Sequence, residues 1–93
     1  MPKVIVVGQV EDTTKWEEGF RTHGDHFKNN MGVTGAIAFA INEGNEVAVC
    51  FEPADAAHFM AAMQTPENIA AMEQDGIKRD TVKVYVMDRE FQP

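Results

Sequence analysis

The chain of 93 residues carries 15 acidic and 8 basic side chains, which gives a net charge of −7 at neutral pH. This length is typical of one domain, so residues 1–93 are expected to form a single unit that buries only about 60 to 65% of its unfolded surface. The negative charge and the scattered basic residues argue against a nucleic-acid partner. The sequence contains no serine, which excludes serine-based acyl transfer.

The cellular location follows from what the sequence lacks. No apolar run is long enough to span a membrane, and the first residues lack the pattern of a secretory signal. Cys50 is the only cysteine, so it cannot close a disulfide within the chain. No CxxC motif is available for zinc or redox chemistry. These features predict a cytoplasmic protein without a membrane partner, and we expect it to work without a cofactor or a metal.

The first elements along the chain are a strand and a helix. Residues 3–10 form an apolar, β-branched run that predicts a strand buried on both faces. Residues 12–14 each have a side chain that can cap the start of a helix, and Thr14 forms a capping-box pattern with Glu17. Apolar residues then recur at helical spacing and predict one amphipathic helix that ends near Gly32. Its apolar stripe contains Trp16, Phe20, His23, Phe27 and Met31.

A β-hairpin is predicted in the middle of the chain. Residues 33–42 alternate between two faces, which is the period of a strand. Residues 42–45 supply turn chemistry before a third strand over residues 46–52, and Pro53 ends that strand. The two strands are therefore expected to pair in antiparallel fashion.

The last third of the chain predicts two helices and a strand. Residues 54–64 carry a helical apolar face, and Thr65 caps a second, shorter helix that stops at Gly76. Residues 81–88 alternate as a fourth strand. The resulting order is β-α-β-β-α-β, the ferredoxin-like α+β fold with a four-stranded antiparallel sheet.

This fold leaves one face of the sheet without helices. The predicted strands nevertheless carry apolar side chains on both faces, and four strands cannot hide the open face by themselves. A second copy of the chain is the simplest cover. We therefore expect a homodimer in which two sheets pack together.

The chain contains several short features that carry a family resemblance: Lys15-Trp16 at the helix start, Phe20 with His23, Asn45-Glu46-Val47, Phe51-Glu52, Phe59, Thr65-Pro66-Glu67 ahead of Met72, and Gly76-Ile77. With these features the chain resembles the dimeric α+β barrel superfamily, which includes antibiotic-biosynthesis-monooxygenase-like proteins and polyketide cyclases. The resemblance implies a dimeric barrel and a small cofactor-independent enzyme of cyclase, isomerase or monooxygenase type. Its substrate would be a hydrophobic aromatic or polyketide-like molecule. The Asn and Trp pair of the superfamily's cofactor-free monooxygenases is not placed on this sequence.

The candidate catalytic group is His23, because it lies on the apolar stripe of the first predicted helix. A partly buried imidazole can act as a general base or acid at neutral pH. Glu52 would orient it, and Tyr85 would donate a hydrogen bond from its phenol. The alternatives are a core histidine bonded to the backbone, a solvated strand-end glutamate and a half-buried strand aromatic.

A binding cavity is predicted from the small residues of the second and third strands. If Ala36, Ala38, Ala40, Ala48 and Cys50 face the helices, they leave room for a ligand. The alternative is that large aromatic residues fill this room, as in an ordinary core. The expected lining consists of Trp16, Phe20, Phe27, Ala38, Cys50 and Phe59.

Two questions stay open at the level of sequence. His23 and His26 form an HxxH pair that can share a metal, but no third ligand is evident and we predict no metal. The protein can also be a non-catalytic dimer that binds a small apolar ligand or supports another enzyme.

Overall fold

A computed structural model describes residues 2–93. Over these residues four strands form one antiparallel sheet in the order β2-β3-β1-β4, which confirms the predicted ferredoxin-like fold. No helix in this part of the chain has the length and apolar character needed to cross a bilayer. The strands are β1 (Lys3–Gln9), β2 (Ala38–Ile41), β3 (Glu46–Phe51) and β4 (Lys83–Met87). The α-helices are α1 (Thr13–Arg21), α2 (Gly24–Asn29), α3 (Ala56–Met63) and α4 (Pro66–Gln74).

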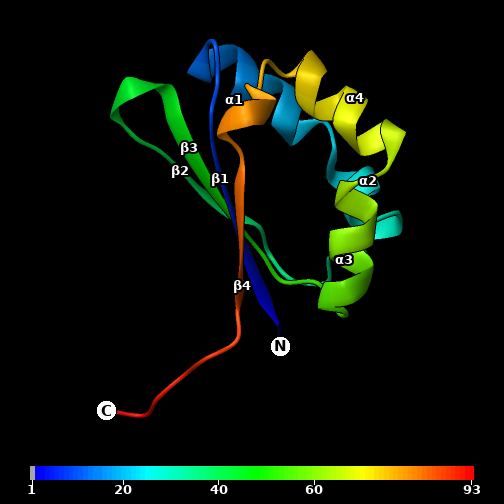
Figure 1. Cartoon of the computed structure of the whole chain (residues 1–93). Coiled ribbons are helices and arrows are strands. Elements are labelled where there is room, and N and C mark those ends of the chain that lie inside the picture. The colour runs from blue at the N-terminus through cyan, green and yellow to red at the C-terminus, as the bar shows by residue number, and fades with distance from the viewer. Residues whose placement is uncertain (1) are drawn as a thin grey trace.

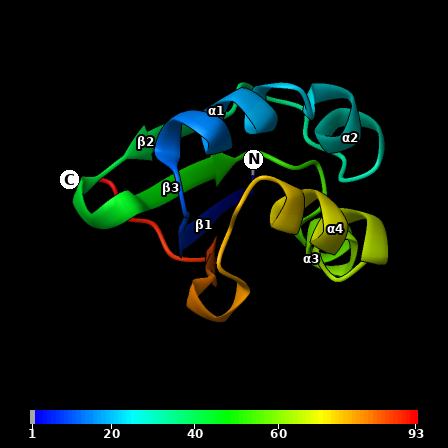
Figure 2. The ribbon, with the colours of Figure 1, turned by 90° about the horizontal axis from the view of Figure 1, so that it is seen from above.

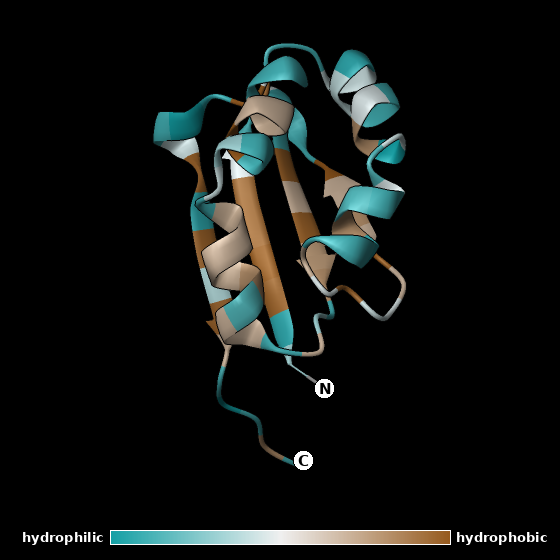
Figure 3. Ribbon diagram, turned by 90° about the vertical axis from the view of Figure 1, so that its right-hand side faces the viewer, coloured by the Kyte–Doolittle hydropathy of each residue, from teal (hydrophilic) through white to brown (hydrophobic). Residues whose placement is uncertain are grey.

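The α-helices gather on one side of the sheet, and the residues after β4 extend away from it (Figure 1). Seen from above, α1 lies over β2 and β3, while α3 and α4 form a neighbouring pair (Figure 2). Coloured by hydropathy, the strands behind the helices are mostly apolar (Figure 3). The hydrophobic core therefore lies between the helices and one face of the sheet.

The register of the strands decides which side chains enter this core. Phe39, Val49, Val6 and Val84 lie opposite one another across the four strands. The ring of Phe39 meets that of Trp16 on α1 with centroids 5.7 Å apart, so this row faces the helices. The buried core comprises Val4, Val10, Trp16, Phe20, Phe27, Met31, Val33, Val47, Val49, Phe51, Phe59 and Ala62.

The neighbouring row of the sheet points to the other side. Successive side chains of a strand alternate between faces, so Ala38, Cys50, Ile5 and Tyr85 form a row on the side without helices. Ile5 and Cys50 are half-buried, whereas Tyr85 is 48% exposed. The first strand is thus not buried on both faces as predicted, because no element of residues 2–93 covers this side.

The single helix expected up to Gly32 is wrong, because the chain forms two helices with a break between them. At the end of α1 the backbone N–H groups of Thr22 and His23 donate to the carbonyls of Gly19 and Phe20, a tighter turn than an α-helix makes. The Thr22 hydroxyl also donates to the Gly19 carbonyl, at 2.6 Å. The chain then restarts as α2 at Gly24, with His23 at its N-cap.

The strand expected over residues 33–42 is too long. Regular pairing with β3 covers only Ala38–Ile41, and Val33 makes an isolated bridge to Pro53. Between these points the Thr34 backbone N–H and hydroxyl both bond to the Glu52 carbonyl. The hairpin itself is confirmed: β2 and β3 are antiparallel and joined by a 3₁₀ turn, Glu43–Asn45.

The helix pair near the C-terminal end agrees with the prediction. Asp55 caps α3, and the Thr65 hydroxyl caps α4 by accepting from the Asn68 N–H. Gly76 follows α4 with a φ of +83°, a left-handed conformation that glycine adopts without a steric penalty. The second 3₁₀ turn, Arg79–Thr81, then leads into β4.

The cap of α1 gives a test of the fold. The Asp12 carboxylate accepts from the N–H groups of Thr14 and Lys15 at 2.9 and 3.1 Å. Asp12→Ala removes both bonds and should lower the free energy of unfolding by about 1 kcal/mol in chemical denaturation. Glu18→Ala, an exposed change within the same helix, should stay within about 0.5 kcal/mol of wild type. Equal losses for the two variants would contradict the assigned cap.

Candidate functional site

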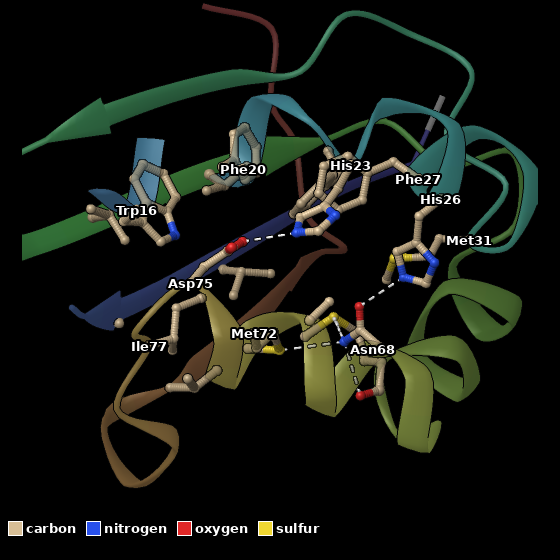
Figure 4. A pocket seen from close by; sticks show the side chains of 18 of the residues that line it. Trp16, Phe20, His23, His26, Phe27, Met31, Asn68, Met72, Asp75 and Ile77 are labelled. Atoms are coloured by element: carbon tan, nitrogen blue, oxygen red, sulfur yellow. Dashed lines mark hydrogen bonds and ion pairs between the residues drawn. The ribbon is translucent and has the colours of Figure 1, made fainter. Parts of the chain in front are cut away.

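A cavity of about 60 Å³ lies between the helix-facing side of the sheet and helices α1, α2 and α4. Trp16, Phe20 and Phe27 pack ring against ring along one wall, with centroids 4.9 and 5.2 Å apart. Its lining is mostly apolar, and Figure 4 shows the polar side chains that enter it from two sides, which are those of His23, His26, Asn68 and Asp75.

The central polar contact of the cavity joins His23 to Asp75. Nε2 of His23 lies 3.0 Å from Oδ2 of Asp75, although the two residues are 52 positions apart in sequence. His23 occupies the break between α1 and α2, and Asp75 is the C-cap that follows the last residue of α4. The side chain of Asp75 is 9% exposed and that of His23 is 21% exposed. The pair therefore bridges two walls of the cavity and lies largely out of water.

Two glycines make this contact possible. A Cβ at Gly19 would collide with Oδ1 of Asp75, so only glycine at this position of α1 leaves room for the carboxyl group. Glycine within a helix lowers the stability of the folded state by about 1 kcal/mol relative to alanine. At position 19 glycine is nevertheless required, because a larger residue would collide with Asp75. Gly76 lets the chain turn away at the end of α4, directly after Asp75.

The electrostatics of the site centre on the buried carboxyl group. Burial raises the pKa of Asp75 above its ordinary value of 3.8, and the charge and hydrogen bond of His23 act in the opposite direction without cancelling the shift. A carboxyl group with a raised pKa that lines a cavity is a candidate functional group.

A second polar contact joins His26 to Asn68 across the same cavity. His26 Nε2 lies 3.1 Å from the Asn68 Oδ1, and the Asn30 amide donates to His26 Nδ1 at 2.9 Å. These partners assign the Nε2–H tautomer to His26. The Asn68 amide in turn donates to the Met63 carbonyl at 3.2 Å. Because both of its ring nitrogens are engaged, His26 fixes α2 against α4.

The structure places three of the expected lining residues on the cavity. Trp16, Phe20 and Phe27 line it, and His23 enters it as expected for the candidate catalytic group. Phe59 is fully buried but packs on Phe51, with centroids 5.0 Å apart, and does not line the cavity. The aromatic residues pack against one another as in an ordinary core, and a small cavity remains beside them.

The prediction that Ala38 and Cys50 line the cavity is wrong. Their strands place Phe39 and Val49 toward the helices, so alternation turns Ala38 and Cys50 to the open face of the sheet. The small residues face away because the large ones of the same strands fill the core. The free space lies instead between helices α1, α2 and α4 and the helix-facing side of the sheet.

The predicted partners of His23 also lie elsewhere. Glu52 alternates with Phe51 onto the open face and lies 3.9 Å from the Lys3 ammonium group. Tyr85 pairs with Ile5 on that face and is about half exposed. Neither side chain enters the cavity, and the carboxyl group that contacts His23 is that of Asp75 instead of Glu52.

A shared metal on the two histidines does not fit their contacts. Nε2 of His23 faces Asp75 and Nε2 of His26 faces Asn68. Among residues 2–93, no three His, Cys, Asp or Glu side chains come close enough together to hold a metal ion. These histidines instead connect α2 to α4.

Asp75 and Asn68 are the site residues that sequence reasoning missed. Asp75 precedes a glycine at a helix end, where a polar residue is ordinary, and Asn68 lies in the first turn of a helix. The one signal was Gly19, since a glycine inside an amphipathic helix indicates close packing against that face. Gly19 indicates that another part of the chain packs closely on this position of α1, but the sequence does not identify Asp75 as that partner.

Comparison with known proteins supports the fold. No protein-family model matches the sequence, and no curated protein matches it significantly. Among solved structures, a putative antibiotic biosynthesis monooxygenase from Bordetella bronchiseptica aligns over 97% of both chains, with a TM-score of 0.77 and 11% identity. SnoaB from Streptomyces nogalater, a cofactor-independent oxygenase, aligns over 98% of this chain and 94% of its own, with a TM-score of 0.71 and 12% identity. At3g17210 from Arabidopsis thaliana aligns over 100% and 99%, with a TM-score of 0.70 and 10% identity.

These similarities establish the class of fold. The chain has the ferredoxin-like fold of the antibiotic biosynthesis monooxygenase structures, and the alignments cover nearly all of each chain. Identities of 11 and 12% support the fold alone, so any activity must be argued from the residues of the cavity.

The raised pKa of Asp75 predicts a specific pH dependence of stability. Between pH 3.8 and the raised pKa, the unfolded chain has released this proton while the folded chain retains it. Wild type should therefore lose stability relative to Asp75→Asn as the pH rises through that window. Urea unfolding of both proteins from about pH 3 to about pH 6 measures the difference.

Asp88→Asn serves as the matched control for that titration. Asp88 is exposed beyond β4, so this variant reports the loss of one negative charge without a change in the cavity. A stability difference between wild type and Asp75→Asn that stays constant across the pH range would contradict the burial of Asp75.

Proposed function

We propose that this protein is a small cofactor-independent enzyme that removes a proton from a hydrophobic aromatic or polyketide-like molecule. The observation that carries the proposal is the His23–Asp75 pair, 3.0 Å apart at the wall of an apolar cavity. A histidine oriented by a buried carboxylate is the arrangement that a general base requires. The likeness in fold to SnoaB, a cofactor-independent oxygenase, adds support for chemistry without a cofactor.

The proposed step uses the free nitrogen of the imidazole. Above its pKa, the Asp75 carboxylate accepts the Nε2–H of His23, which leaves the Nδ1 lone pair available. Nδ1 takes a proton from a carbon next to a carbonyl group, and the electron pair of that C–H bond moves onto the carbonyl oxygen. The products are an enolate and an imidazolium ion, which the Asp75 carboxylate stabilises. Cyclisation, isomerisation and cofactor-free oxygenation can each begin with this step.

The size of the cavity limits how a ligand enters. Its free volume of about 60 Å³ is well below the roughly 300 to 1,000 Å³ of typical ligand pockets. Met63 and Met72 form part of its lining, and methionine side chains change conformation more easily than branched ones. In this proposal the two side chains move aside, and the ligand places its reacting end beside His23.

A non-catalytic dimer that binds a small apolar ligand is the second candidate. The mostly apolar lining favours binding of an apolar ligand as much as it favours catalysis. This candidate assigns His23 and Asp75 only to holding α2 against α4. The two candidates differ in whether His23 exchanges protons with a bound ligand.

Proton exchange in deuterated water separates the candidates. Acetophenone and a small set of 1,3-diketones are incubated with the protein, and loss of the α-proton signals is followed by NMR. We expect exchange above the buffer rate for at least one compound, and His23→Ala should reduce the protein-dependent rate by a factor of about 10² or more.

The control for this experiment is His58→Ala. His58 is an exposed histidine on α3 that bonds the Asn30 carbonyl at 3.0 Å and does not line the cavity. This variant should keep the wild-type rate. Exchange at the buffer rate for every compound, or a His23→Ala rate equal to wild type, would reject the enzyme in favour of the binding dimer.

We also propose that two copies of the chain pair through the open face of the sheet, in the cytoplasm. The support is the row of Ala38, Cys50, Ile5 and Tyr85, together with Met87, which is 49% exposed on the same face. Apolar side chains gathered on one face of a small domain are typical of an interface. The lone Cys50 suits a reducing compartment.

Sedimentation velocity at micromolar concentration tests the pairing. The sedimentation coefficient of wild type should correspond to twice the mass of the monomer. Tyr85→Lys should shift the protein toward monomer, because it places a charge in the apolar interface. Ala61→Lys makes the same change of charge on an exposed position of α3 and should leave the dimer intact. A wild-type monomer, or equal effects of the two variants, would contradict the proposed interface.

A further inference from the structure

The indole N–H of Trp16 is a buried donor without a partner. Trp16 is 1% exposed, and its Nε1 makes no hydrogen bond to any atom of residues 2–93. Buried tryptophan N–H groups usually have a partner, and an unpaired one destabilises the folded state. Such a group in an otherwise well-bonded core therefore calls for an explanation.

The position of this donor connects it to the cavity. Trp16 lines the cavity, and Figure 4 shows its indole nitrogen on the side of the ring that faces Asp75. Gly19, one turn further along α1, is the residue against which the Asp75 carboxyl rests. The unpaired N–H and the His23 imidazole thus lie on the α1 side of the cavity, and the Asp75 carboxyl group reaches this side from the end of α4.

We propose that Trp16 positions the ligand by donating its Nε1–H to a ligand oxygen. This inference rests on the proposed cavity and names the class of ligand: a ring compound with a carbonyl, enol or phenol oxygen, rather than a pure hydrocarbon. The oxygen takes the place at the Asp75 end of the cavity, and the ring lies against the aromatic wall of Phe20 and Phe27. In the proton-transfer step, the same N–H stabilises the negative charge that develops on that oxygen.

The sequence supplies a convenient probe, because Trp16 is the only tryptophan. Its indole N–H gives a single resonance in a ¹⁵N–¹H NMR spectrum. Cyclopentanone and methylenecyclopentane are matched ligands that differ by an oxygen in place of a CH₂ group. Both are titrated against wild type and against His23→Ala, so that binding is observed whether or not proton transfer occurs.

We expect cyclopentanone to move the indole proton downfield in both proteins, and methylenecyclopentane not to do so. A net hydrogen bond corresponds to a factor of about 2 to 10 in Kd, so the ketone should bind more tightly by that factor. Replacing Trp16 by β-(3-benzothienyl)alanine, which carries sulfur in place of the N–H, should remove the preference and leave hydrocarbon binding unchanged. Trp16→Phe should have the same effect where it folds.

Three results would overturn the inference. Equal affinities for the two compounds in wild type would show that no hydrogen bond distinguishes them. A ketone preference that survives in the benzothienyl protein would assign the oxygen to another donor. No change of the indole resonance with either compound would show that the cavity does not admit a ligand beside Trp16. A downfield shift without α-proton exchange would instead support Trp16 and reject only the catalytic role of His23.

Discussion

The burial of one carboxyl group organises the helical side of this molecule. Asp75 lies at the end of α4, in an apolar cavity, and its contact to His23 at 3.0 Å joins the break between α1 and α2 to the far wall. A buried carboxyl group is unfavourable unless it is bonded, so the histidine and the open position at Gly19 are both needed for it. The break in the first helix then has a role, since it brings His23 to the N-cap of α2 and onto this carboxyl group.

The two faces of the sheet have different surroundings. On one face, the row through Phe39 and Val49 builds the core and the floor of the cavity. On the other, the row through Ile5 and Cys50 has no cover within one chain and supplies the surface proposed for the second copy. A site on the first face and association on the second do not compete for the same residues.

The sequence predicted the four strands, their order and the helix pair after β3, because strand alternation and helix caps are local signals, but it missed the break between α1 and α2. Local signals did not decide which face of the strands turns toward the helices, and the large residue Phe39 rather than its small neighbour Ala38 entered the core. The site was predictable at His23 but not at its partner, because Asp75 is 52 residues away and its surroundings are those of an ordinary helix end. Glu52 was preferred because alternation places it on the same strand face as Ala48 and Cys50, and that face turns away from the helices.

The most direct test of this account is a crystal structure of the protein purified from its own host, inspected for density in the cavity. The account predicts a bound ring compound whose oxygen lies within hydrogen-bond distance of Trp16 Nε1, with His23 and Asp75 still paired beside it. A cavity closed by side chains, with the Trp16 N–H bonded to a protein atom and His23 turned away from Asp75, would contradict it.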